Sequence, residues 1–250
     1  MRGLNTKTET FYLSTIERED IDVFVITESW LQSNISSSEI FVLDKYVIFV
    51  DLLLAGKKRE GGVILATKSK LNVVEINLEH QIVGVELICV KLKLETKSFY
   101  ILGFYLATNN NAETYTNFFS LIESLQFTLN SDIFIVGDLN IIDLNNYYLD
   151  GRCNAVIRSF LNFQALINLN QHNRIVNANN RILDVVLATK NLEVQITKAD
   201  EPQVAVDLHH PPLEIQVKTI KGKVSFLKPN KTESFDFSKA DFLSLYNDLK

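Results

Sequence analysis

The chain has 250 residues, 46% of them hydrophobic, which is enough to build a sizeable core in one layered domain. Its formal net charge of −5 argues against binding nucleic acid through broad electrostatic attraction, although clustered carboxylates that hold a cation also lower the net charge. Two cysteines, Cys89 and Cys153, give no basis for a disulfide framework and indicate a reducing, intracellular compartment.

Short runs rich in β-branched and aromatic residues recur along the chain, and each predicts a strand. These runs are 22–27, 46–50, 62–67, 71–78, 81–94, 98–106, 132–139, 181–189 and 213–219. Between them, apolar residues spaced three and four apart predict helices over 112–130 and 153–166, and a similar amphipathic pattern covers 6–20. The longest apolar stretch, YVIFVDLLLA, is too short to span a membrane and contains Asp51, so no membrane partner is expected.

This balance of many strands and few long helices predicts an α/β sandwich of packed sheets with helices outside, because an alternating βα barrel would need more helices. We expect one domain over residues 1–220. Residues 221–250 read as a linker and a short helix that lead toward a further region downstream.

Polar residues stand at the ends of several predicted strands. Glu28 directly follows the run 22–27, and Asp138 with Asn140 closes the run IFIVGDLN; ligand sites collect at such strand ends in layered α/β folds. Asp184 lies inside the apolar run RILDVVLAT, where an ionised carboxylate needs a partner. We expect that partner to be His209.

A structural interpretation remains open for each of these residues. Acids and amides at strand ends are ordinary turn formers, and Asp184 fits equally well as an acceptor for backbone amides. The stretch His210-Pro211-Pro212 fits a stiff entry into the last strand, and Tyr105 fits a core aromatic residue.

Taken in order, the motifs ITESWL, REGGVIL, GFYLATNN, IFIVGDLN, NNRILDVVLAT and DLHHPPL resemble the endonuclease/exonuclease/phosphatase superfamily. Within it, the sequence is most similar to the apurinic-type endonuclease domain of non-LTR retrotransposons, particularly those of insects. The flanks RGLNTKT and FSKADFLSLYNDL resemble those of the same domain. The resemblance implies a DNase I-like, four-layered α/β sandwich of two mixed sheets flanked by helices.

The resemblance also implies hydrolysis of a DNA phosphodiester with Mg²⁺ or Mn²⁺, which nicks a target strand to prime reverse transcription. By motif position, Glu28 would bind the metal, Asp138 would orient or deprotonate the attacking water, and Asn140 would position that water and the phosphate. His209 would stabilise the developing charge, held by Asp184, and Tyr105 would contact the phosphate. A reverse transcriptase domain would follow downstream, and the protein would act in the nucleus.

Two departures from the family pattern predict impaired turnover. The family has Ser-Asp-His in its last motif, whereas this sequence, with His209 as the site histidine, has Asp207-Leu208-His209. Because successive side chains of an extended segment point to opposite faces, Asp207 is a doubtful member of the site. The family also has an Asn two residues before the Arg of the RGL motif, and Arg2 here is preceded only by Met1.

Smaller departures are Tyr105-Leu106-Ala107-Thr108 in place of Tyr-x-Pro-Pro and a basic cluster reduced to Lys57, Lys58 and Arg59. The departures leave three hypotheses open. The chain is an active endonuclease, a noncatalytic remnant of the fold used as a binding module, or a phosphatase that acts on a small phosphate ester.

Overall fold

The structure is a computed structural model of the chain. It describes residues 4, 7–12, 16, 21–31, 40–52, 61–78, 82–94, 97–108, 110–125, 131–199 and 207–219. These residues belong to one compact unit, Met1–Ile220. The predicted linker and helix over 221–250, the basic cluster at 57–59 and the flank at 1–3 lie outside the described residues.

The central element is a six-stranded mixed sheet with the order β4-β5-β6-β7-β9-β8. Its strands are β4 (Asn72–Glu75), β5 (Val85–Lys93), β6 (Ser98–Leu106), β7 (Asp132–Asp138), β8 (Leu169–Gln171) and β9 (Asp184–Thr189). Strands β6 and β7 pair in parallel and the other neighbours pair antiparallel. Because β7 also pairs with β9, its carboxyl end lies between the end of β6 and the start of β9.

Two smaller antiparallel sheets accompany it. One has the order β1-β3-β2, and the other is the hairpin β10-β11. Their strands are β1 (Val23–Ile26), β2 (Tyr46–Asp51), β3 (Val63–Lys68), β10 (Leu192–Lys198) and β11 (Leu213–Thr219).

The helices are α1 (Thr8–Phe11), α2 (Ala112–Ser124), α3 (Leu144–Asp150) and α4 (Ala155–Ile167). Both long helices begin at an asparagine whose side chain accepts a backbone N–H one turn later: Asn111 from Thr114, and Asn154 from Ile157. Asparagine is among the best residues for this capping position, and the caps therefore fix where α2 and α4 start. None of the helices in the described part of the chain has the length and apolar character needed to cross a membrane.

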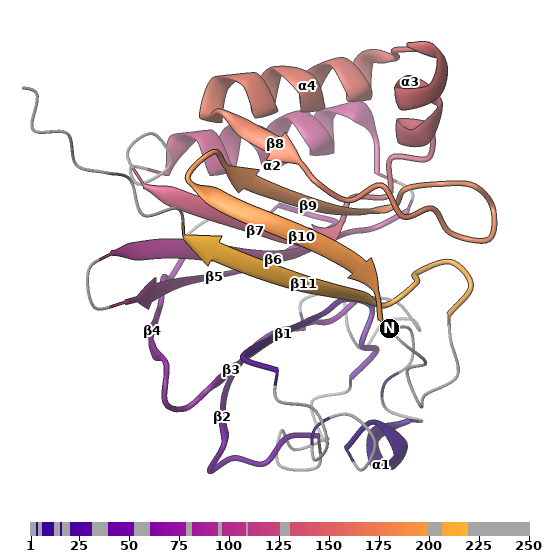
Figure 1. Cartoon of the computed structure of the whole chain (residues 1–250). Helices are drawn as coiled ribbons and strands as arrows, with labels where there is room; N and C mark the ends of the chain where they lie inside the picture. The colour runs from indigo at the N-terminus through magenta and orange to yellow at the C-terminus, as the bar shows by residue number, and fades with distance from the viewer. Residues whose placement is uncertain are drawn as a thin grey trace, which may run out of the picture. The chain divides into compact units, whose positions relative to one another are not determined.

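In the described part of the chain, three hydrophobic clusters pack the layers against one another. The first packs α2 and α4 against one face of the six-stranded sheet, with Phe119 and Phe163 stacked at 4.8 Å between ring centroids. The second joins the other face of that sheet to β3, β10 and β11, and the third covers the outer face of β1 and β3 with Phe11 and Phe41. The succession of helices, sheet, sheet and helix is visible in Figure 1 and confirms the predicted four-layered α/β sandwich.

The strand predictions are largely confirmed, and those at 98–106 and 213–219 coincide with β6 and β11 at both ends. Three short or polar elements are absent from the predictions. Strand β8 has three residues, α3 has seven, and the outer face of β10 carries Glu193, Gln195 and Thr197, so none of them has a long apolar run.

Candidate functional site

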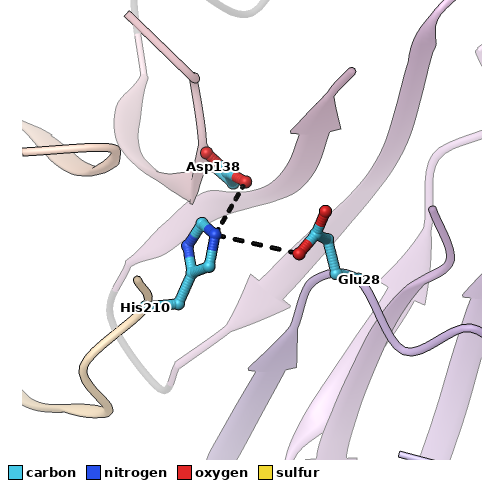
Figure 2. Close-up of side chains that lie close together, drawn as sticks. All are labelled: Glu28, Asp138 and His210. Carbon is cyan, nitrogen blue, oxygen red and sulfur yellow. Dashed lines mark ion pairs between the residues drawn. The ribbon is translucent and has the colours of Figure 1, made fainter. Parts of the chain in front are cut away.

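Four acidic or histidine side chains from distant parts of the sequence meet at one edge of the two packed sheets. Glu28 lies two residues beyond the end of β1, Asp138 is the last residue of β7, and Asp184 is the first residue of β9. Asp138 and Asp184 are register partners across β7 and β9. Figure 2 shows His210, from the segment that leads into β11, pointing between Glu28 and Asp138.

His210 is the histidine of this site. Its Nδ1 lies 3.1 Å from Asp184 Oδ2 and 3.3 Å from Asp184 Oδ1. Its Nε2 lies 3.7 Å from Glu28 Oε2 and 3.7 Å from Asp138 Oδ2. The His209 ring is exposed, and its Nδ1 lies 3.3 Å from Asn179 Nδ2. The prediction that His209 pairs with Asp184 is therefore wrong, because the neighbouring His210 makes that contact.

A tight turn over 207–210 explains which histidine points inward. His210 N–H donates to the Asp207 carbonyl, and His209 N–H donates to Asp207 Oδ1. The outer side of the turn is tied down by Asn177, whose Nδ2 donates to the His209 carbonyl. Leu208 is 68% exposed. The Asp207 carboxylate therefore shapes the turn.

Asn140 orients Asp138. The Asp138 carboxylate is fully buried, and its two oxygens accept the Asn140 backbone N–H at 3.1 Å and the Asn140 Nδ2 at 2.9 Å. The same Nδ2 donates to the Leu106 carbonyl at 2.7 Å, which ties the group to the end of β6. Asn140 has a φ of 53°, a left-handed conformation that asparagine tolerates better than most residues. The Asn140 amide group is therefore held between the Leu106 carbonyl and the Asp138 carboxylate.

Tyr105 and Glu28 form the other half of the site. Tyr105 is 1% exposed, and its hydroxyl donates to Glu28 Oε1 at 3.1 Å. Glu28 has a φ of 52°, which costs a residue with a Cβ on the order of 1–2 kcal/mol. Backbone strain of this kind persists where surrounding contacts over-determine it, and it gathers at functional sites.

Burial and neighbouring charges shift the pKa values of Asp138 and His210. Burial raises the pKa of Asp138 well above its ordinary value, and the negative charges of Asp184 and Glu28 raise it further, against the lowering effects of His210 and the Asn140 N–H. Burial lowers the pKa of His210, but the hydrogen bond and charge of Asp184 and the charges of Asp138 and Glu28 outweigh it, and the pKa rises to about 9. His210 is therefore protonated at neutral pH.

The donor set fits a divalent cation. One potential ligand atom from each of Glu28, Asp138 and His210 lies within 4.8 Å of the other two. Because a protonated imidazole cannot coordinate a cation, the carboxylate oxygens are the candidate metal ligands. Carboxylate oxygens are the donors that Mg²⁺ and Mn²⁺ prefer. The mutual repulsion that raises the Asp138 pKa is also what a cation would relieve.

The structure thus brings together Glu28, Tyr105, Asp138, Asn140 and Asp184, five of the residues selected from the sequence. It leaves out His209 and Asp207 and adds His210, which the sequence showed only as the start of a stiff strand entry. Two adjacent histidines carry no local signal for which one faces inward.

No protein-family model matches the sequence, and no curated protein does either. Solved structures match its fold at low identity. The catalytic domain of Xenopus laevis APE2 superposes with a TM-score of 0.59 at 12% identity over 87% of this chain and 91% of that one. The human Nocturnin catalytic domain gives 0.57 at 14% identity, covering 85% and 86% of the two chains. The endonuclease domain of TRAS1, a telomere-specific non-LTR retrotransposon, gives 0.54 at 13% identity, covering 70% and 80%.

These likenesses extend over most of the chain and over most of each matched domain. The chain therefore has the DNase I-like fold of the endonuclease/exonuclease/phosphatase superfamily.

Proposed function

We propose that the protein is a divalent-metal-dependent phosphodiester hydrolase that nicks DNA. The observation that carries this proposal is the meeting of three acids and a histidine: Glu28 just after β1, Asp138 at the end of β7, Asp184 at the start of β9 and His210 at the entry to β11. Paired acids, a protonated histidine and a candidate cation site together supply what the attack of water on a phosphodiester requires.

Glu28 would hold the metal through a carboxylate oxygen. A bound Mg²⁺ or Mn²⁺ supplies Lewis-acid stabilisation of charge on a phosphoryl oxygen. Tyr105 contributes by fixing one oxygen of Glu28 through its hydroxyl, which leaves the other oxygen facing His210 and the centre of the site. Direct contact between Tyr105 and the phosphate remains a prediction.

Asp138 orients the attacking water and accepts its proton. A raised pKa makes this carboxylate a stronger base than an ordinary aspartate, which favours transfer of the water proton to it. The two donors of Asn140 keep the Asp138 carboxylate in one orientation, and the water is oriented with it.

His210 stabilises the negative charge that develops on the phosphoryl oxygens. It carries a proton at neutral pH because its pKa is about 9, and its Nε2 points to the centre of the site. Asp184 holds the ring by its Nδ1 and so fixes the direction of the Nε2–H bond. A donor that is already in place where charge develops is worth about 10²–10³ in kcat.

DNA is the proposed substrate because several proteins of this fold act on it. A 3'-5' exonuclease from Neisseria meningitidis matches with a TM-score of 0.57, and a related structure holds a product DNA hairpin. The likeness to TRAS1, together with the sequence motifs, supports the finer proposal of a retrotransposon-type endonuclease that acts in the nucleus beside a reverse transcriptase.

Turnover is expected to be slower than in a site with the full family pattern. With His210 as the site histidine, the residue directly before it is His209, where the family has an aspartate. The departure is thus one position further along the chain than the sequence alone placed it. Loss of one supporting group typically costs about 10–100-fold in activity or metal affinity.

Nicking of supercoiled plasmid with Mg²⁺ or Mn²⁺ tests the proposal. We expect His210→Ala to lower the rate about 100-fold or more. His209→Ala is the matched control: it removes an adjacent histidine that is exposed and points away, and it should retain most of the rate.

The remaining hypotheses predict other results. Equal background cleavage by the wild type and His210→Ala, with no stabilisation by Mn²⁺, would identify a noncatalytic remnant. Hydrolysis of a chromogenic phosphate ester without plasmid nicking would identify a phosphatase.

A further inference from the structure

Glu86 is a fully buried carboxylate in the middle of an apolar strand. It lies on β5 within the run VELICVKL and is 0% exposed. Removing a carboxylate from water is costly unless hydrogen bonds replace its hydration, so a residue of this kind marks a specific contact. One such contact is clear: Glu86 Oε2 accepts the Gly62 backbone N–H at 2.6 Å.

The turn that Glu86 holds is also the turn that supports Glu28. The Gly62 carbonyl accepts the Ser29 N–H at 3.0 Å, and the Gly61 carbonyl accepts the Trp30 N–H at 3.0 Å. Residues 61 and 62 therefore form a backbone clamp on the two residues that follow Glu28. Glu86 anchors this clamp from β5.

The clamped segment needs external support because its backbone is left-handed at non-glycine residues. Glu28 has a φ of 52° and Trp30 a φ of 53°. Gly61 and Gly62 are left-handed as well, with φ of 77° and 89°, and a Cβ on Gly62 would collide with Ser29 Oγ. The two left-handed turns therefore approach each other so closely that position 62 requires glycine.

Glu86 also faces Tyr105. The two residues are register partners across β5 and β6, so their side chains share one face of the sheet. Tyr105 contacts the Glu28 side chain directly, and Glu86 contacts the Gly61–Gly62 turn, whose carbonyls bind the N–H groups of the two residues after Glu28. Neighbouring strands thus act on Glu28 in two ways: β6 holds its side chain through Tyr105, and β5 supports the main chain directly after it through the Gly61–Gly62 turn.

We propose that Glu86 is a positioning residue for Glu28, which acts by accepting the Gly62 N–H and so fixing the clamp on Ser29 and Trp30. Its importance for metal binding rests on the proposed function, whereas its effect on the conformation of residues 28–30 does not. Glu86 touches neither substrate nor metal in this role.

Trp30 provides a direct readout because it is the only tryptophan in the sequence. Its indole Nε1 is buried, so release of the clamp should shift its fluorescence emission to the red and increase quenching by acrylamide. Glu86→Asp keeps the charge but is one methylene too short to reach Gly62, and Glu86→Leu removes the acceptor. Both should shift Trp30 emission and raise the Mn²⁺ dissociation constant about 10–100-fold.

Two further variants separate positioning from general loss of stability. Glu86→Gln keeps an acceptor oxygen at the same reach and should retain wild-type Trp30 emission and Mn²⁺ affinity. Thr189→Val removes another side-chain acceptor of a backbone N–H, that of Ile133, at the opposite end of β7 from Asp138. It should lower the melting temperature without changing Trp30 emission or Mn²⁺ affinity.

A folded Glu86→Asp or Glu86→Leu variant with the wild-type Trp30 spectrum would overturn the inference. If neither variant folds, Glu86→Gln decides, since a shifted spectrum there would show that the clamp depends on charge and not on the acceptor. A wild type that binds no Mn²⁺ would defeat the proposed function but leave the Trp30 comparison valid.

Discussion

His210 Nδ1 lies 3.1 Å from Asp184 Oδ2, although 26 residues separate the two in sequence. The pair joins the entry of β11 to the first residue of β9, and both side chains are largely buried, at 9% and 18% exposure. The contact holds the imidazole in one orientation toward Glu28 and Asp138, and it supports the positive charge of the ring.

The raised pKa of His210 predicts a stability contribution that depends on pH. The folded-state pKa is about 9 against an ordinary 6.5, so the stabilisation is fully present below pH 6.5 and is lost as the pH rises through 9. A shift of this size corresponds to about 3 kcal/mol. Urea unfolding without divalent metal should show His210→Asn less stable than wild type at pH 6.5, with a difference that shrinks by pH 10. An unchanged difference would contradict the assigned charge.

Metal addition should stabilise the wild type through Glu28. A ligand present at 100 times its dissociation constant stabilises the folded state by about 2.7 kcal/mol, which raises the melting temperature. Glu28→Gln should give a much smaller rise at the same Mn²⁺ concentration. Glu193→Gln, which alters an exposed carboxylate on β10, is the control and should match the wild type. Equal shifts in all three proteins would place the ion elsewhere.

The position of the site histidine predicts which substitution restores the family pattern. With His210 in the site, Leu208→Ser with His209→Asp places a carboxylate directly before it, and we expect nicking to increase about 10-fold or more. The alternative double change, Asp207→Ser with Leu208→Asp, fits a site built on His209 and should give no increase. Rate measurements on plasmid compare the two directly, and a gain confined to the second variant would reverse the assignment.

Alanine substitutions at Gly62 and Gly151 distinguish the energetic cost of backbone strain from that of a steric collision. Gly62 and Gly151 both have positive φ, 89° and 77°, so alanine at either costs about 1–2 kcal/mol for the left-handed conformation. A Cβ at Gly151 meets no atom within 4 Å, whereas at Gly62 it would collide with Ser29 Oγ. Gly62→Ala should therefore destabilise more than Gly151→Ala in urea unfolding and should also shift Trp30 emission. Equal losses with no spectral change would indicate that the two turns do not approach closely.

Much of the fold could be predicted from the sequence because its strands are marked locally. The run SFYILGFYL is apolar enough to predict strand β6 without reference to the rest of the chain. The asparagines before α2 and α4 mark where those helices start. Glu28, Asp138 and Asn140 were predictable for a similar reason, since each follows a strand whose end is visible in the sequence. Glu86, the acid in VELICVKL, resembles Asp184 in the sequence, because each is an ionisable group in an apolar run. The sequence pattern does not, however, indicate that Glu86 contacts the turn at Gly62.

The sequence by itself determined the layered α/β class, most of the strands and which acids stand at strand ends, because these features depend on the identity and spacing of neighbouring residues. Only the tertiary structure decided between His209 and His210. That choice depends on the turn over 207–210 and on its anchoring by Asn177 and Ala178, about 30 residues earlier in the chain. The tertiary structure also determines the raised pKa of His210. Burial and the charges of Asp184, Asp138 and Glu28 act on the ring only once the segments that carry them are packed together.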